Sequence, residues 1–147
     1  ILIGAFVFIP FMALTQIPSN LVGFLVGLDV GQLGVLIIIL VTYIALGTFL
    51  EGLAMLVLTL HITFPVIIEM GLDPIWFGVV VIKLLEIGLI TPPVGLNVFV
   101  IANVVGREAP IDKIFAGITR FLSVDFIVLI LIMSFPMISL LIPMAAR

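Results

Sequence analysis

The chain has 147 residues, of which 65% are hydrophobic and 9% are charged, and its formal net charge at pH 7 is −3. Soluble domains carry about 45–50% apolar and about 25% charged residues, so this composition excludes an ordinary soluble domain. No basic stripe supports nucleic-acid binding; the chain has no cysteine for disulfides or thiolate metal sites, and only one histidine, His61, for a zinc site.

Long runs without a charged residue predict membrane-spanning helices. No Asp, Glu, Lys or Arg occurs over 1–28, 30–50 or 126–146. An apolar run of roughly 18 or more residues can cross the hydrocarbon core as a helix, and these runs lack the polar face of a soluble helix. We therefore expect an all-α, polytopic membrane protein surrounded by the lipid bilayer.

The first apolar run predicts a partial membrane span over 1–18 that ends at Pro18. The run begins at Ile1 without an initiator methionine or a signal-peptide pattern. We therefore expect the chain to be one part of a larger helical bundle.

A polar interruption at 47–52, which contains Glu51, divides the next apolar segment into two halves. The whole segment is longer than one span, but each half is short for a full crossing. Two geometries fit: two ordinary helices with a tight turn, or a re-entrant hairpin whose polar tip is enclosed by protein or faces a water-filled cavity. We favour a re-entrant hairpin over 35–69.

A discontinuous helix is predicted over 74–105. Asp73 suits an N-cap and Pro74 suits the first helical position. Farther along, Thr91 is followed by two prolines, which lack amide hydrogens and clash with the preceding turn, so the helix must open there.

The most polar connector predicts a short interfacial helix over 107–120, because apolar residues recur there at amphipathic spacing. Its Arg107, Lys113 and Arg120 place it on the cytoplasmic side by the positive-inside rule. The last span is predicted over 121–144.

The two interruptions have the chemistry of a cation site. An opened helix leaves carbonyls with partial negative charge at the end of its first half. Gly88 and Thr91 occupy that place in the discontinuous helix, and Gly47 and Thr48 occupy the matching place at the other interruption. Carbonyl and hydroxyl oxygens suit an alkali cation without a carboxylate. The alternative is that these residues only kink a helix.

The second half of the discontinuous helix predicts contacts to an anion. Val94 and Gly95 begin that half with free amides, and Asn97 can offer a side-chain amide to a substrate.

Lys83 and Glu86 stand at i,i+3 and can pair, and we favour an ion-pair scaffold over proton transfer. The roles of these two residues and of His61 stay unassigned.

Two stretches resemble a known family. The run Leu85–Asn97, with its Thr-Pro-Pro-Val-Gly core, resembles the signature of the large permease subunit of TRAP transporters, which take up dicarboxylates and sialic acid. The stretch Leu46–Glu51, followed by Leu56 to Pro65, is similar to the other C-terminal landmark of that family. The likeness extends over essentially the whole chain.

The resemblance implies an elevator-type member of the ion-transporter superfamily, in which residues 1–147 form the C-terminal inverted repeat. It implies a coupling Na+ ion, and no other cofactor, held at Gly47, Gly88, Thr91 and Val94. Thr48, Gly95 and Asn97 are then assigned to the substrate. The implied partners are the N-terminal repeat, a small membrane subunit and a periplasmic substrate-binding protein, in a bacterial inner membrane.

The leading hypothesis is sodium-driven import of a small organic anion of the C4-dicarboxylate or sialic acid type. The alternatives are a permease of a sister family without a binding protein, and a non-transporting membrane assembly subunit. An intramembrane enzyme is disfavoured, because the aspartates, Asp125 among them, are expected near helix ends and no motif surrounds His61.

Overall fold

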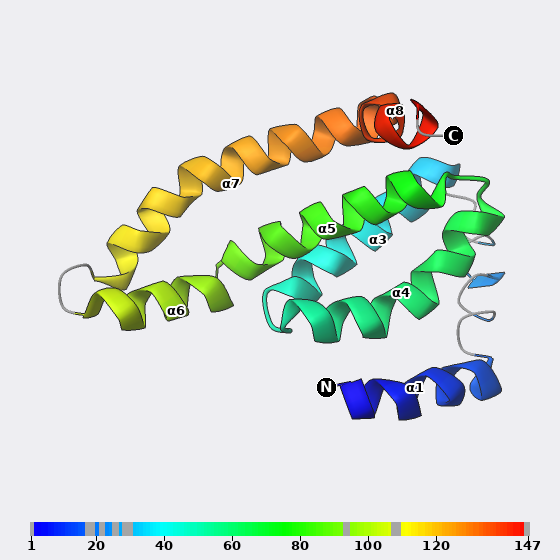
Figure 1. Cartoon of the computed structure of the whole chain (residues 1–147), viewed down its shortest axis with the longest axis horizontal. Helices are drawn as coiled ribbons and strands as arrows, with labels where there is room; N and C mark the ends of the chain where they lie inside the picture. The colour runs from blue at the N-terminus through cyan, green and yellow to red at the C-terminus, as the bar shows by residue number, and fades with distance from the viewer. Residues whose placement is uncertain are drawn as a thin grey trace.

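The computed structural model describes residues 2–16, 20, 23–24, 27, 31–92, 95–106 and 110–145. Within these residues all regular secondary structure is helical, as predicted. The helices are α1 (Leu2–Thr15), α3 (Gly31–Gly47), α4 (Gly52–Glu69), α5 (Pro74–Ile90), α6 (Leu96–Val105), α7 (Ile111–Ser134) and α8 (Met137–Ala145) (Figure 1). Of the described helices, α4 and α7 are long and apolar enough to cross a membrane by length and composition. The expected end of the first span at Pro18 and the connector residue Arg107 lie outside the described residues.

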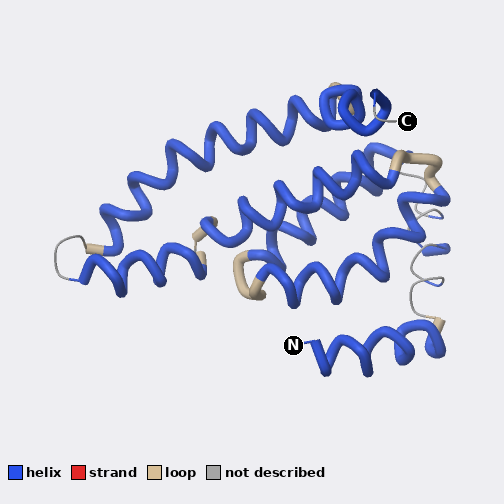
Figure 2. Tube along the Cα trace, in the orientation of Figure 1, coloured by secondary structure: helices blue, strands red, loops and turns tan. Residues whose placement is uncertain are grey.

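Helices α3 and α4 are antiparallel arms joined by a turn over residues 48–51 (Figure 2). Glu51 caps α4, because its carboxylate accepts the backbone N–H groups of Leu53 at 3.0 Å and Ala54 at 3.1 Å. At the opposite end the side-chain amide of Gln32 donates to the carbonyl of Met70 over 2.7 Å. The two arms are therefore tied together at both ends. Re-entry of this pair into the membrane stays a prediction.

Helix α5 is the central element and packs against α3, α4, α7 and α8 (Figure 1). Its N-terminus has Asp73 as N-cap, with Oδ1 accepting from the N–H of Ile75 at 2.8 Å, and Pro74 in the first turn. One face of α5 is buried at helical spacing. The core that it forms with its neighbours contains Val35, Leu36, Ile39, Leu40, Tyr43, Met55, Val66, Ile67, Trp76, Phe77, Val80, Val81, Leu84, Ile87 and Leu129.

The core holds one fully paired polar cluster. The hydroxyl of Tyr43 lies 2.9 Å from Oγ1 of Thr63, which itself donates to the carbonyl of Thr59 over 3.0 Å. The Tyr43 ring meets Phe77 edge-to-face, with 6.5 Å between ring centroids. The cluster links α3, α4 and α5 without an unpaired buried side-chain polar atom among the described residues.

The C-terminal helices differ from the predicted division into an interfacial helix over 107–120 and a last span over 121–144. Helix α7 runs without interruption from Ile111 to Ser134, so no helix end separates the two segments. The change from amphipathic to apolar sequence near residue 120 does not interrupt backbone hydrogen bonding, and no proline stands there. The interruption comes instead at Pro136, after which α8 begins at Met137.

This correction moves Asp125, which the sequence placed near a helix end, into the interior of α7.

Candidate functional site

Two helix interruptions meet in the structure. We call residues 48–51, between α3 and α4, the first break, and residues 91–95, between α5 and α6, the second break. Figure 2 draws residues 48–51 and the described residues of the second break, 91–92 and 95, as loop. Gly47 and Gly88 touch through their backbones: a Cβ added to Gly88 would lie 2.7 Å from the Cα of Gly47. Leu89 lies close to Gly52, where an added Cβ would be 3.6 Å from Leu89 Cδ1. The ends of α3 and α5 are thus held together.

The second break follows from proline chemistry. In a continuous helix the carbonyl of Gly88 would accept from the amide of residue 92, which is proline and has no N–H. The Gly88 carbonyl instead accepts from the N–H of Thr91 at 3.2 Å, a tighter turn that ends α5. The same argument frees the carbonyl of Leu89, since residue 93 is also proline.

The hydroxyls of both predicted threonines are fixed by bonds to the preceding turn. Thr91 donates to the carbonyl of Ile87, and Thr48 donates to the carbonyl of Ala45 over 2.7 Å. Because the single hydroxyl hydrogen is used in each case, the lone pairs of the oxygen stay available to a cation. Thr48 is buried, with 5% of its surface exposed, and Thr91 is half-buried.

Gly95 begins α6 from the left-handed region, with φ 55° and ψ 69°. It is buried, and its carbonyl accepts the N–H of Val98 at 2.8 Å. The amides of Leu96 and Asn97 come before the first acceptor of the helix, so the start of α6 is a positively polarised end. Asn97 lies in that first turn with an exposed side chain.

The structure therefore brings two of the predicted residues, Gly47 and Gly88, into contact. Thr48 and Thr91 directly follow the same helix ends, and Gly95 and Asn97 lie on the far side of the second break. Val94 lies outside the described residues. No group of three or more His, Cys, Asp or Glu side chains that could hold a metal occurs among the described residues. The oxygens at the breaks are those of backbone carbonyls, of the hydroxyls of Thr48 and Thr91, and of the Glu51 carboxylate, which caps α4.

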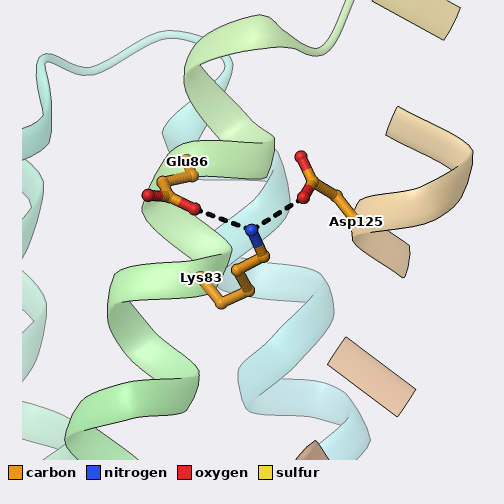
Figure 3. A network of polar contacts seen from close by, with 3 residues as sticks. All are labelled: Lys83, Glu86 and Asp125. Atoms are coloured by element: carbon orange, nitrogen blue, oxygen red, sulfur yellow. Dashed lines mark hydrogen bonds and ion pairs between the residues drawn. The ribbon is translucent and has the colours of Figure 1, made fainter. Parts of the chain in front are cut away.

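A charged cluster that the sequence only partly indicated lies on α5. The ammonium of Lys83 contacts Glu86 at 2.8 Å, as the spacing predicts, and also Asp125 of α7 at 2.7 Å (Figure 3). The contact to Asp125 was missed because that residue was expected near a helix end. A signal was present in the sequence, since an isolated carboxylate in an otherwise apolar span needs a partner.

His61 is half-buried on α4, with Nδ1 2.9 Å from the carbonyl of Val57. It lines a cavity of about 380 Å³ together with Leu60, Phe64 and Pro65. The cavity lies on α4, away from the polar groups of the two breaks.

Comparison with known proteins matches residues 1–138 to the family "Tripartite ATP-independent periplasmic transporter, DctM component". The sialic acid TRAP transporter large permease protein SiaM of Vibrio cholerae is 36% identical over 140 residues, which cover 95% of this chain and 32% of that protein. The C4-dicarboxylate TRAP transporter large permease protein DctM of Pseudomonas aeruginosa is 32% identical over 97% of this chain and 33% of its own length.

The isethionate TRAP transporter permease protein DctMQ of Oleidesulfovibrio alaskensis is 34% identical over 97 residues, covering 66% of this chain and 15% of that protein. The chain spans about a third of the length of the SiaM and DctM relatives.

Proposed function

Because the chain belongs to the DctM component family of tripartite ATP-independent periplasmic transporters, we propose that it is the C-terminal repeat of a permease that imports a small organic anion together with Na+. The relatives are permeases named for sialic acid, C4-dicarboxylates and isethionate, which supports a carried organic acid. The complete permease spans a bacterial inner membrane several times. It works with its N-terminal repeat, a small membrane subunit and a periplasmic binding protein.

The observation that carries this proposal is the backbone contact between Gly47 and Gly88. The contact holds the C-terminal end of α3, with its backbone carbonyls, against the C-terminal end of α5. Inside a membrane little water is available to bond these carbonyls. Carbonyl oxygens of Gly47 and Gly88, with the hydroxyl of Thr91, supply hard neutral ligands for Na+. We assign Val94 to the same site as the fourth contributor.

The substrate is proposed to lie against the start of α6. The unpaired amides there favour a carboxylate, and the exposed Asn97 side chain can donate to it. Gly95 lets the backbone approach closely because it carries no side chain. We assign Thr48 of the first break to the same substrate. Binding of Na+ orders both breaks, and the repeat then carries both solutes across by an elevator movement.

The alternatives are less favoured. A sister family without a binding protein does not fit the match to the tripartite family over residues 1–138. A non-transporting assembly subunit has no need for two helix breaks in contact.

The test is Na+ activation of the complete transporter, with its small subunit and binding protein, in sealed vesicles. Thr91→Val removes the hydroxyl ligand and should raise the half-activating Na+ concentration roughly tenfold, which corresponds to about 1.4 kcal/mol. The matched control is Thr119→Val on α7, because Thr119 makes the same bond to the carbonyl four residues earlier, at 2.9 Å, away from the breaks. An unchanged Na+ requirement in Thr91→Val, or transport without Na+ in the wild type, would overturn the proposal.

A further inference from the structure

One lysine ammonium makes both of the salt bridges found among the described residues. Lys83 Nζ lies 2.7 Å from Asp125 Oδ1 and 2.8 Å from Glu86 Oε2 (Figure 3). The side chains of Lys83 and Asp125 are 21% and 22% exposed, whereas that of Glu86 is 58% exposed. The better-shielded pair is thus the one that joins two helices. In surroundings of low polarity such a pair is strong, and losing either partner leaves a costly lone charge.

Helix α7 bridges the second break. It packs against both α5 and α6, the two halves of the discontinuous helix, and runs alongside both (Figure 1). Helix α5 ends at Ile90 and α6 begins at Leu96, so the two halves are not one continuous helix. The two halves contact each other directly across the break, and α7 is the described helix that packs against both of them. A shift of α7 would therefore act on both halves.

The Lys83–Asp125 pair ties α7 to the half that carries the proposed cation ligands. Lys83 precedes Gly88 on α5 by little more than one turn, roughly 7.5 Å along the axis at 1.5 Å per residue. A shift of α7 along α5 would break this pair and move α6 relative to Gly88 and Thr91.

We propose that Lys83 is a positioning residue for the cation site: through Asp125 it holds α7 across the second break and so sets the spacing of the two half-helices. This inference rests on the proposed function. Glu86 lies on the same helix as Lys83 and cannot join α5 to α7. It serves as a local counter-charge that shares the ammonium.

The two carboxylates give a matched pair of variants. Asp125→Asn removes the link between the helices, and Glu86→Gln removes a contact to the same ammonium within one helix. In the complete transporter, Asp125→Asn should raise the half-activating Na+ concentration roughly 2- to 30-fold, the range for substitutions that act through a coupled network. Glu86→Gln should change it less than about twofold. The double variant Lys83→Asp with Asp125→Lys should restore the wild-type value, because a carboxylate on α5 again pairs with an ammonium on α7.

A second readout does not depend on transport. The chain has no cysteine, so spin labels can be placed at Ile75→Cys on α5 and Val104→Cys on α6, both exposed positions, in a permease freed of other cysteines. The label-to-label distance distribution should broaden in Asp125→Asn and stay narrow in Glu86→Gln and in the charge-swapped variant.

Equal effects of Asp125→Asn and Glu86→Gln would overturn the inference, as would an Asp125→Asn protein with a wild-type distance distribution and Na+ requirement. If Asp125→Asn does not assemble, the charge-swapped variant decides: a raised Na+ requirement in it contradicts the bridge. Wild-type transport that ignores Na+ would remove the proposed function, while the distance measurement would still decide whether the ion pair fixes the break.

Discussion

Gly47 and Gly88 meet backbone to backbone, and a Cβ added to Gly88 would lie 2.7 Å from the Cα and 2.9 Å from the carbonyl carbon of Gly47. Gly47 is the last residue of α3, and Gly88 lies in the last turn of α5. No side chain fits between them, so two glycines are what allow the ends of these helices to touch. The contact fixes the position of one break relative to the other.

Gly88→Ala should therefore damage both stability and Na+ activation. The backbone of α3 must move to admit the methyl group, at a cost of about 1–3 kcal/mol. Thermal unfolding of the complete permease in lipid nanodiscs measures the loss. The control is Gly78→Ala on the same helix, where an added Cβ meets no atom within 4 Å and should stabilise by up to about 1 kcal/mol. Equal stability of the two variants would contradict the contact.

Gly95→Ala should destabilise the start of α6 more than Gly71→Ala destabilises the turn before α5. The positive φ of 55° costs an alanine about 1–2 kcal/mol, and its Cβ would also lie 3.2 Å from Val98 Cγ2. Gly71 has a similar φ of 69° with no atom near an added Cβ, so Gly71→Ala should show the conformational cost alone. Transport should fall in Gly95→Ala and persist in Gly71→Ala. Similar transport by both variants would speak against substrate binding at the second break.

Trp76→Phe should have an effect that depends on Pro136. In a continuous helix the carbonyl of Ile132 would accept from the amide of residue 136, but residue 136 is proline and has no N–H. The indole Nε1 of Trp76 donates to this carbonyl instead, over 2.9 Å. Removing the indole N–H leaves that carbonyl unpaired, at a cost of about 1–3 kcal/mol. In a Pro136→Ala background the amide returns, so the same substitution should cost less. A double-mutant cycle on thermal stability measures the difference, and additive effects would show that the indole does not replace the missing amide.

Tyr43→Phe and Thr63→Val should destabilise unequally, although they break the same hydrogen bond. Thr63 already donates to the carbonyl of Thr59, so the Tyr43 hydroxyl is the donor between them. Tyr43→Phe removes the donor together with its hydroxyl and should cost about 0.5–1.5 kcal/mol. Tyr43 is 1% exposed, and Thr63→Val leaves its hydroxyl only the Thr59 hydroxyl as a side-chain partner. The loss of the buried acceptor should cost about 1–3 kcal/mol. Unfolding in nanodiscs compares the two, and a larger loss in Tyr43→Phe would reverse the assigned direction.

Local backbone chemistry explains which structural features could be predicted from the sequence. The Asp73 cap and the end of α5 near Thr91 depend on residues close in the chain. The Asp73 carboxylate accepts hydrogen bonds from nearby amides, and the prolines after Thr91 lack an amide hydrogen to donate. The boundary expected near residue 120 was wrong because a change in composition does not break helical hydrogen bonds. Pro136 had the same signal as the earlier prolines, and that signal was missed.

The sequence by itself determined that this chain is apolar and helical and that its helices open at two places, because hydrophobicity and the missing amides of proline act locally. Only the tertiary structure decided that Gly47 lies on Gly88, that Lys83 pairs with Asp125, and that α7 bridges the second break. These contacts join residues far apart in the chain. They depend on how the apolar faces of α3, α5 and α7 pack. Because these helices are hydrophobic on most sides, their sequences do not indicate which faces meet.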